Sequence, residues 1–434
     1  MYGHSRHKLL TLFLLSAAFH FPTGAQDTVR MTLDSCLRYA YGHNLTVLTA
    51  ELNGESARNT LSGAKMRFLP SVNASASQGL GWSDQTTRSG NYGINASLPL
   101  FSGLGTVANL KQARAGLEQS DLQAQQTRNN VGVRILQQYL TLLMNREKLA
   151  YQQEVLQTSI QQEREGEVRL RVGKILESDY QLLQASRISA ESEVQNTRLT
   201  IEQNRADLAT LIGYEEGGVL EAVAPLDSLN AEGREVMAYG TLLTRARESM
   251  PDWQLGDLEV EMAQLNVDIA RSNFLPSLSL NAGASYSDGT VLSDNPVTHL
   301  QGGLNSSLTL GLSIPIFNAG SSLTNYRQSK IALRQAELQR RQEVLDLESQ
   351  LQELHTSTCQ ALNRFRASEA LAHAYRASYD VYTIKYGQGA VTTVELLQQQ
   401  DRYLSALNDW LQNKYSYLLA EKQLDIYTGK EITL

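Results

Sequence analysis

Two stretches of the chain share one pattern of alternating apolar and small polar residues. Residues 68–101 begin with FLPS and end with LPLF, and residues 274–317 begin with FLPS and end with IPIF. Inside the second stretch, Leu278 and Leu280 alternate with Ser279 and Asn281. A period of two residues is typical of β-strands. We therefore expect strands at about 70–82, 91–100, 276–286 and 306–315.

Each expected strand has one apolar face and one face of small polar residues. Roughly nine to twelve residues with this alternation fit a tilted strand that crosses a bilayer. The same pattern also fits a half-buried strand of a soluble sandwich. The alternation by itself leaves both interpretations open.

Helical segments surround both stretches. The proline-free segment from Leu104 to about Val172 is rich in Gln, Glu, Leu and Ala, and about 70 residues at ~1.5 Å each would extend roughly 100 Å. The other expected helices cover 33–66, 177–211, 242–273, 321–386 and a last segment that ends at Gly429. In that last helix apolar residues recur every seven positions at Leu396, Tyr403, Trp410, Tyr417 and Leu424, which indicates that long helices pack side by side.

The two halves of the chain repeat one plan. Phe68 and Phe274 are 206 residues apart, whereas Gly173 and Gly389 are 216 apart, and the difference falls in the second strand connection, Ser287 to Gly303. We divide the chain into a first repeat at 26–213, a linker at 214–240, a second repeat at 241–429 and a tail at 430–434. The glycines and Pro225 between residues 213 and 240 break any long helix there.

Residues 1–25 have the features of a secretory signal peptide. Arg6 and Lys8 precede an apolar core from Leu9 to about Phe21, and Thr23-Gly24-Ala25 follows. We expect cleavage near Ala25/Gln26, and the short core, which His20 interrupts, argues against a membrane anchor. After this segment the sequence has no run of 18 apolar residues, so no spanning helix is expected.

Composition and motifs argue against catalysis. The 434 residues carry a net charge of −7, and no basic region indicates nucleic acid. Residues 103–108 fit a dinucleotide pattern, but the preceding strand alternates and the following helix is far too long for a βαβ unit. We expect no enzyme activity, no cofactor and no metal. Cys36 and Cys359 are too few for a disulfide framework, and whether they pair stays open.

Glycines interrupt the long helices at two corresponding places. Asp179 follows Gly173 by six residues, Glu395 follows Gly389 by six, and Tyr386 precedes Gly389 by three. Acidic residues here would stabilise the start of the next helix through its dipole. A functional role at the far end of the helices is compatible with that capping role, and both interpretations stay open.

Four membrane-length strands cannot close into a barrel, because the smallest barrels of this kind have eight strands. An open edge in lipid leaves backbone groups without hydrogen bonds, so the chain must form oligomers of two, three or four copies. Aromatic residues at the strand ends would form the two girdles of such a barrel: Phe68, Phe101, Phe274 and Phe317 at one end, and Trp82, Tyr92 and Tyr286 at the other.

The duplicated FLPS and L/I-P-L/I-F motifs, the N-x-x-Q early in the next helix and the glycine turns resemble the TolC family of outer-membrane efflux proteins. The resemblance covers the whole mature chain. It implies a homotrimer with a 12-stranded β-barrel in the outer membrane of a Gram-negative bacterium, continued by a periplasmic α-helical barrel of long antiparallel helices. It also implies a periplasmic adaptor and an inner-membrane pump of the RND, ABC or MFS class as partners, in multidrug efflux or type I secretion.

The resemblance also implies a gate at the periplasmic helix tips. The matching positions are Gly173, Asp179, Tyr386, Gly389, Glu395 and Gln398. Val391 and Gln398 replace a basic and an acidic residue of a well-studied branch, so we expect a looser or differently latched gate. A periplasmic coiled-coil adaptor or scaffold without a pore is the alternative, and the cargo and the pump class stay open.

Overall fold

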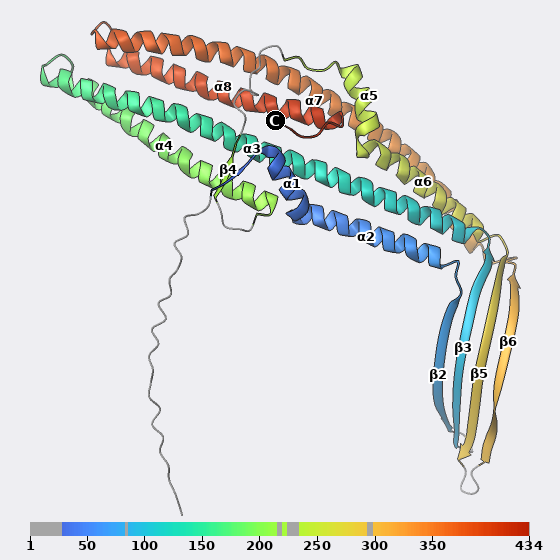
Figure 1. Cartoon of the computed structure of the whole chain (residues 1–434). Helices are drawn as coiled ribbons and strands as arrows, with labels where there is room; N and C mark the ends of the chain where they lie inside the picture. Colours follow the sequence, from blue (N-terminus) through green and yellow to red (C-terminus); the bar gives the residue numbers. More distant parts are fainter. Residues whose placement is uncertain (1–27, 83–85, 215–218, 224–233, 293–297, 434) are drawn as a thin grey trace, which may run out of the picture.

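A computed structural model describes residues 28–82, 86–214, 219–223, 234–292 and 298–433. The expected signal peptide and its cleavage position near Ala25/Gln26 lie outside these residues. The molecule is elongated, with a sheet at one end and long helices that extend away from it (Figure 1). Among the helices of the described segments, none has an apolar stretch long enough to cross a membrane.

Four antiparallel strands form one sheet in the order β2-β3-β5-β6. The strands are β2 (Ser71–Trp82), β3 (Thr86–Ser102), β5 (Ser277–Leu292) and β6 (Thr298–Ser313). The central β3–β5 pair joins the two halves of the chain. Three strands run further into the connections than the alternation predicts: β3 begins at Thr86, β5 ends at Leu292 and β6 begins at Thr298. Strand pairing continues there because it depends on backbone hydrogen bonds, and these do not require alternating apolar side chains.

Two pairs of long helices extend from the sheet and turn back at the end of the molecule opposite the sheet. The first pair is α3 (Gly105–Arg171) and α4 (Glu177–Ile212), and the second is α7 (Ser321–Gly387) and α8 (Thr393–Tyr427). With 67 residues each, α3 and α7 are roughly 100 Å long. We call α3–α4 the first hairpin and α7–α8 the second hairpin.

Two segments that we predicted as single helices are each divided. Residues 33–66 form α1 (Leu33–His43) and α2 (Leu45–Met66), because Asn44 has an extended backbone and its side chain caps α2 by accepting from the N–H groups of Thr46 and Val47. Residues 242–273 lie in α5 (Tyr239–Ser249) and α6 (Pro251–Ser272). Pro251 is the first residue of α6 and keeps Met250 out of helical geometry.

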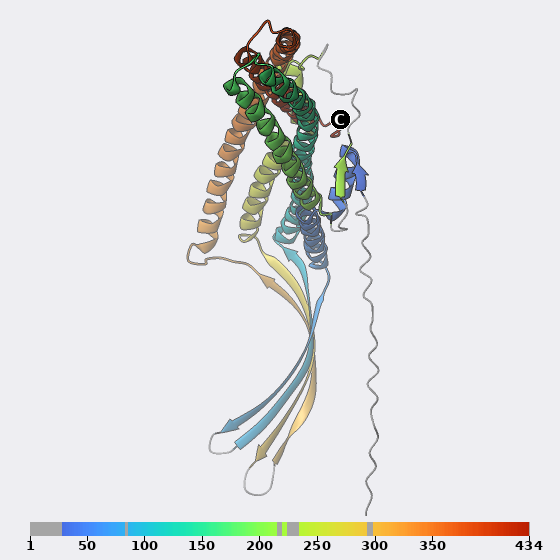
Figure 2. The ribbon, with the colours of Figure 1, turned by 90° about the vertical axis from the view of Figure 1, so that its left-hand side faces the viewer.

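The helices follow the order of the strands. Next to the sheet, the contacts run α2 to α3, α3 to α6 and α6 to α7. Toward the far end, α4 packs on α3, α3 on α8 and α8 on α7 (Figures 1 and 2). The helical part is therefore a curved layer whose edges are α2 or α4 on one side and α7 on the other.

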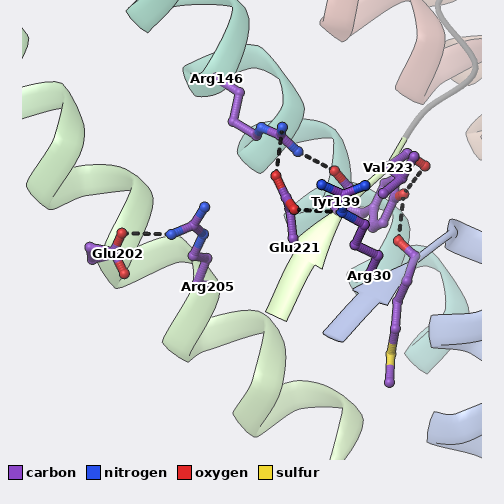
Figure 3. Close-up of polar contacts among 9 residues, drawn as sticks. Arg30, Tyr139, Arg146, Glu202, Arg205, Glu221 and Val223 are labelled. Carbon is purple, nitrogen blue, oxygen red and sulfur yellow. Dashed lines mark hydrogen bonds and ion pairs between the residues drawn. The ribbon is translucent and has the colours of Figure 1, made fainter. Parts of the chain in front are cut away.

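A small parallel sheet that the sequence patterns did not predict ties the start of the chain to the linker. Strand β1 (Thr28–Met31) pairs with β4 (Val219–Ala222). Beneath it the fully buried Tyr139 of α3 donates from its hydroxyl to the carbonyl oxygens of Met31, at 3.1 Å, and Val223, at 2.6 Å (Figure 3). Burial raises the pKa of Tyr139, so the hydroxyl stays protonated and remains a donor.

Charged side chains complete the attachment of this sheet. Glu221 of β4 lies between two guanidinium groups, with Arg30 at 3.1 Å and Arg146 of α3 at 3.0 Å (Figure 3). Arg146 also donates to the carbonyl oxygen of Ala222. Strand β4 is thus fixed to α3 near the middle of the helical layer.

The two cysteines are free thiols in separate elements, Cys36 in α1 and Cys359 in α7. Cys36 is fully buried in the largest apolar cluster, and desolvation raises the pKa of its thiol to about 12. It therefore behaves as a small apolar core residue.

Candidate functional site

The four-stranded sheet has one apolar and one polar face. The apolar side chains are exposed in a single chain, for example Val72 at 64%, Ile94 at 57% and Leu308 at 73%. The opposite face carries hydroxyl, amide and glycine groups, and the hydroxyl of Ser97 donates to Asn281 at 2.7 Å across β3 and β5. No helix of the described residues covers either face (Figure 2). A continuous exposed apolar face of this kind marks a surface that contacts protein or membrane.

The aromatic residues proposed for the girdles lie at three levels of the sheet. Phe68, Phe101, Phe274 and Phe317 lie at the end where the strands meet the helices. Tyr92 and Tyr286 are direct partners across β3 and β5. Tyr92 is nine residues from Phe101 on β3, which corresponds to about 30 Å along the strand and about 25 Å after tilting, the height of the apolar band of outer-membrane barrels.

Trp82 does not share the level of the two tyrosines. It pairs with Thr86 at the far end of β2, six residues beyond Tyr92 along β3. Its side chain is 77% exposed. The structure therefore brings Tyr92 and Tyr286 together and leaves Trp82 apart from them.

The tips of the hairpins are built on two left-handed glycines. Gly173 has φ +71° and Gly389 has φ +76°, a conformation that costs other residues free energy. In each turn the residue after the glycine donates its N–H to a carbonyl oxygen in the last turn of the preceding helix: Lys174 donates to Arg169 O at 2.8 Å and Ala390 to Lys385 O at 2.9 Å. This is the hydrogen bond of a Schellman motif, and it ends both helices in the same way.

The two acidic residues after the glycines act inside their own turns. Glu395 accepts from the backbone N–H of Thr392 at 2.8 Å and from its hydroxyl at 2.9 Å, and the Thr392 hydroxyl accepts from Glu395 N–H. These hydrogen bonds lower the pKa of Glu395. Asp179 accepts from Leu176 N–H at 3.4 Å. Capping therefore accounts for the contacts of both carboxylates.

Tyr386 lies inside the second hairpin. Its side chain is only 3% exposed and its hydroxyl lies 3.4 Å from that of Thr393. It belongs to an apolar cluster with Leu183 of α4 and Leu396 of α8, and Val391 packs on this cluster. Gln398 is exposed on α8. The predicted set thus divides into turn glycines, caps, one core tyrosine and one surface residue.

One contact at the tips was absent from our prediction. Arg169 of α3 donates to the carbonyl oxygens of Tyr386, at 2.7 Å, and Gly387, at 2.8 Å. Its guanidinium carbon also lies 4.5 Å from the centre of the Tyr386 ring. The contact joins the first hairpin to the second. No sequence motif announces it, because backbone carbonyl groups exist at every residue.

A buried ion pair joins α3 to α8 further from the tips. Lys414 donates to both carboxylate oxygens of Glu147 at 2.9 Å, and the Tyr415 hydroxyl donates to the same carboxylate at 2.9 Å. The side chains of Lys414 and Glu147 are 10% and 24% exposed. Burial, helped by the charge of Glu147, raises the pKa of Tyr415 and keeps its hydroxyl a donor.

The duplicated chain, with an amphipathic sheet at one end of roughly 100 Å helices, has the architecture of outer-membrane channel proteins with a helical extension. The chain belongs to the outer membrane efflux protein family, whose family model matches residues 37–214 and 242–430. The family consists of channels and not of enzymes. Both the resemblance to the TolC family and the predicted fold class are confirmed.

Individual relatives match this chain over nearly its whole length. The chain is 23% identical to outer membrane efflux protein BepC of Brucella suis over 93% of this chain and 87% of that protein. It is 22% identical to outer membrane protein TolC of Vibrio cholerae over 96% and 94%. The crystal structure of the Campylobacter jejuni CmeC outer membrane channel has the same fold, with a TM-score of 0.76, 17% identity and coverage of 92% of this chain and 85% of that one.

Proposed function

We propose that this chain is one subunit of an outer-membrane exit duct in a tripartite efflux or secretion system. The observation that carries the proposal is the four-stranded sheet, whose apolar face is exposed and whose opposite face is polar. An apolar face toward lipid and a polar face toward water are what a strand of a membrane-spanning barrel requires.

The sheet supports a trimer. Its outer strands β2 and β6 each have one edge without a partner among the described strands. Joining β6 of one copy to β2 of the next removes every open edge, and three copies give the twelve strands of the predicted barrel. The polar face then lines a water-filled lumen.

The edges of the helical layer support the same assembly. On α7 three exposed residues recur every seven positions, Ile331, Leu338 and Leu345, and on α2 Leu45 and Leu52 do so. At 100° per residue each stripe lies on the side of its helix opposite the neighbouring α6 or α3. Contact between α7 of one copy and α2 of the next would cover both stripes.

The lumen face explains how one duct would pass varied cargo. Its residues in the β2–β3 ladder are Ser71, Asn73, Ser75, Ser77, Gly79, Gly81, Thr87, Ser89, Asn91, Gly93, Asn95 and Ser97. None of these carries a charge. Hydroxyl and amide groups of this kind solvate many solutes and select weakly by charge. Selection of cargo would then rest with the inner-membrane pump and the periplasmic adaptor.

The far ends of the hairpins would form the periplasmic gate, with the residues that the resemblance indicates: Gly173, Asp179, Tyr386, Gly389, Glu395 and Gln398. Their distance from the sheet supports this, since α3 and α7 place the turns roughly 100 Å from the barrel. The division into two repeats joined by a linker at 214–240 fits the same picture. After removal of the signal peptide, the protein would enter the outer membrane of a Gram-negative bacterium.

The duct is tested by fractionation and conductance. The mature protein should require detergent, run as a heat-modifiable trimer and conduct ions in planar bilayers. A protein that stays soluble without detergent would instead support the alternative, a periplasmic scaffold or adaptor. The exposed apolar sheet face argues against that alternative, because a soluble protein would leave this face in contact with water, which is unfavourable.

The gate positions are tested in the same bilayers. We expect Asp179→Ala and Tyr386→Phe to change the single-channel conductance, since one removes a cap and the other removes a buried hydroxyl. Unchanged conductance in both variants would refute the assignment of these residues to the gate.

A further inference from the structure

The two hairpins touch along a polar line on α3. Ser159 accepts from Gln400 of α8 at 3.3 Å, and Gln162 donates to the Tyr379 hydroxyl of α7 at 3.2 Å. Arg169, seven residues beyond Gln162, makes the contact of this line that lies nearest the tips. Apolar side chains instead dominate the packing of α7 on α8. Near the tips the hairpins are thus held together by these hydrogen bonds and by Leu183 of α4, which packs in the apolar cluster of Tyr386.

The contact of Arg169 is suited to hold a helix end. Tyr386 and Gly387 are the last two residues of α7, where carbonyl groups lack helical partners and the helix dipole is negative. A guanidinium group is always charged and presents donors in a planar fork, so it can bind two such carbonyls at once. Half-burial of Arg169 and the Tyr386 ring below it strengthen the contact.

The contact of Arg169 has no equivalent at the corresponding residue of the second repeat. At the repeat offset of 216 the counterpart of Arg169 is Lys385, in the corresponding place before Gly389. Lys385 is exposed, and its ammonium group lies over Tyr382 of its own helix, 5.6 Å from the ring centre. The backbone of the two turns is alike, but of these two corresponding cations only Arg169 reaches the other hairpin.

We propose that Arg169 is the latch that holds the second hairpin against the first at the tip, an inference that rests on the proposed duct and its gate. Asp179 and Glu395 bond within their own turns and join no hairpins. Release of Arg169 frees the carbonyl end of α7, and the α7–α8 turn then moves away from α3 while the glycine turn itself stays intact.

The test is the conductance of trimers in planar bilayers. In Arg169→Ala, loss of two hydrogen bonds to a charged group should raise the fraction of open channels about tenfold. Arg169→Lys keeps the charge but loses the planar fork of donors. Its fraction of open channels should therefore lie between those of the wild type and Arg169→Ala. Arg171→Ala is the matched control, because Arg171 is exposed near the same helix end and, among the residues that the structure describes, its ion pair is with Glu167 one turn away.

The outcomes separate the latch from the duct. If wild-type trimers do not conduct, the duct itself is refuted. If they conduct and assembled Arg169→Ala trimers show the same open fraction, the latch is overturned. Should the alanine variant fail to assemble, Arg169→Lys decides: an open fraction equal to wild type overturns the latch, and a raised one supports it. An Arg171→Ala effect as large as that of Arg169→Ala also overturns it, because general loss of positive charge would then explain both.

Discussion

At the residue scale, the two turn glycines act through backbone conformation. Gly173 and Gly389 have positive φ, yet a Cβ atom at either position would meet nothing within 4 Å. A substitution there would therefore act through strain of the backbone alone. This separates the turn glycines from positions such as Gly166, where a Cβ would meet Leu183 at 2.5 Å.

Gly389→Ala should destabilise the second hairpin by about 1 to 2 kcal/mol, the cost of a left-handed alanine. Gly387→Ala is the control, since Gly387 ends α7 without positive φ and also has open space, and it should stabilise by up to about 1 kcal/mol. Thermal unfolding followed by circular dichroism in detergent measures both. Equal effects would contradict the role of φ.

The capping glutamate gives a pH dependence. Hydrogen bonds from Thr392 lower the pKa of Glu395, so its ionised form stabilises the folded state. That contribution is complete above the unfolded pKa of about 4.3 and is lost as the pH falls through the lowered pKa. The difference in melting temperature between wild type and Glu395→Ala should therefore be present at neutral pH and vanish in acid. A difference independent of pH would contradict the cap.

At the element scale, the two hairpins are held together by different means along their length. In the middle, the buried pair of Glu147 and Lys414 fixes α8 to α3, and the Trp410 ring lies 5.1 Å from the ammonium group. Near the tips the bonds are those of Arg169, Gln162 and Ser159. The middle of the second hairpin is thus anchored by a charge pair, and its tip by hydrogen bonds of the buried Ser159 and Gln162 and of the half-buried Arg169.

Lys414→Met should lower the free energy of unfolding by about 3 to 5 kcal/mol, because it leaves the Glu147 carboxylate largely buried without its cation. Combining it with Glu147→Gln should recover much of the loss, since no unpaired charge then remains. Arg171→Ala, which removes an exposed pair, should cost less than about 1 kcal/mol. Denaturant unfolding in detergent measures all three, and no recovery in the double variant would contradict this account.

At the scale of the whole molecule, one chain is an incomplete object. Among the described residues, the outer strands each have a free edge, no helix covers the apolar face, and the helical layer ends in the apolar stripes on α2 and α7. In the proposed assembly, neighbouring copies would pair the strand edges and cover the stripes, and lipid would cover the apolar face. The fold of the chain and its assembly are therefore parts of one problem.

Leu338→Asp combined with Leu345→Asp should abolish the trimer, because it places charges on the stripe that faces the next copy. The matched control is Gln339→Asp, which adds a charge on another side of the same helix and should leave the trimer intact. Size-exclusion chromatography with light scattering in detergent measures the assembly. A trimer that persists in the double variant would exclude α7 as the contact edge.

Different features were accessible to sequence reasoning for different physical reasons. Strands with one face toward lipid and one toward water must alternate apolar and polar residues, so the alternation at Leu278 and Leu280 predicts such a strand. Long helices show as proline-free segments with a seven-residue repeat. Pro251 was visible but was not taken as a break. The division at Asn44 depends on its side chain and on a bond to Leu211 O, 167 residues away.

Sequence patterns were enough to derive the duplication, the strand faces, the long helices and the glycine turns, because each follows from local propensity or from which side of an element meets water or lipid. Only the folded molecule shows the β1–β4 pair, the Glu147–Lys414 pair and the position of Arg169 on the end of α7. These contacts join residues far apart in the chain, and the partners of Arg169 are backbone carbonyl groups, which every residue has. Only folding selects the two that it binds.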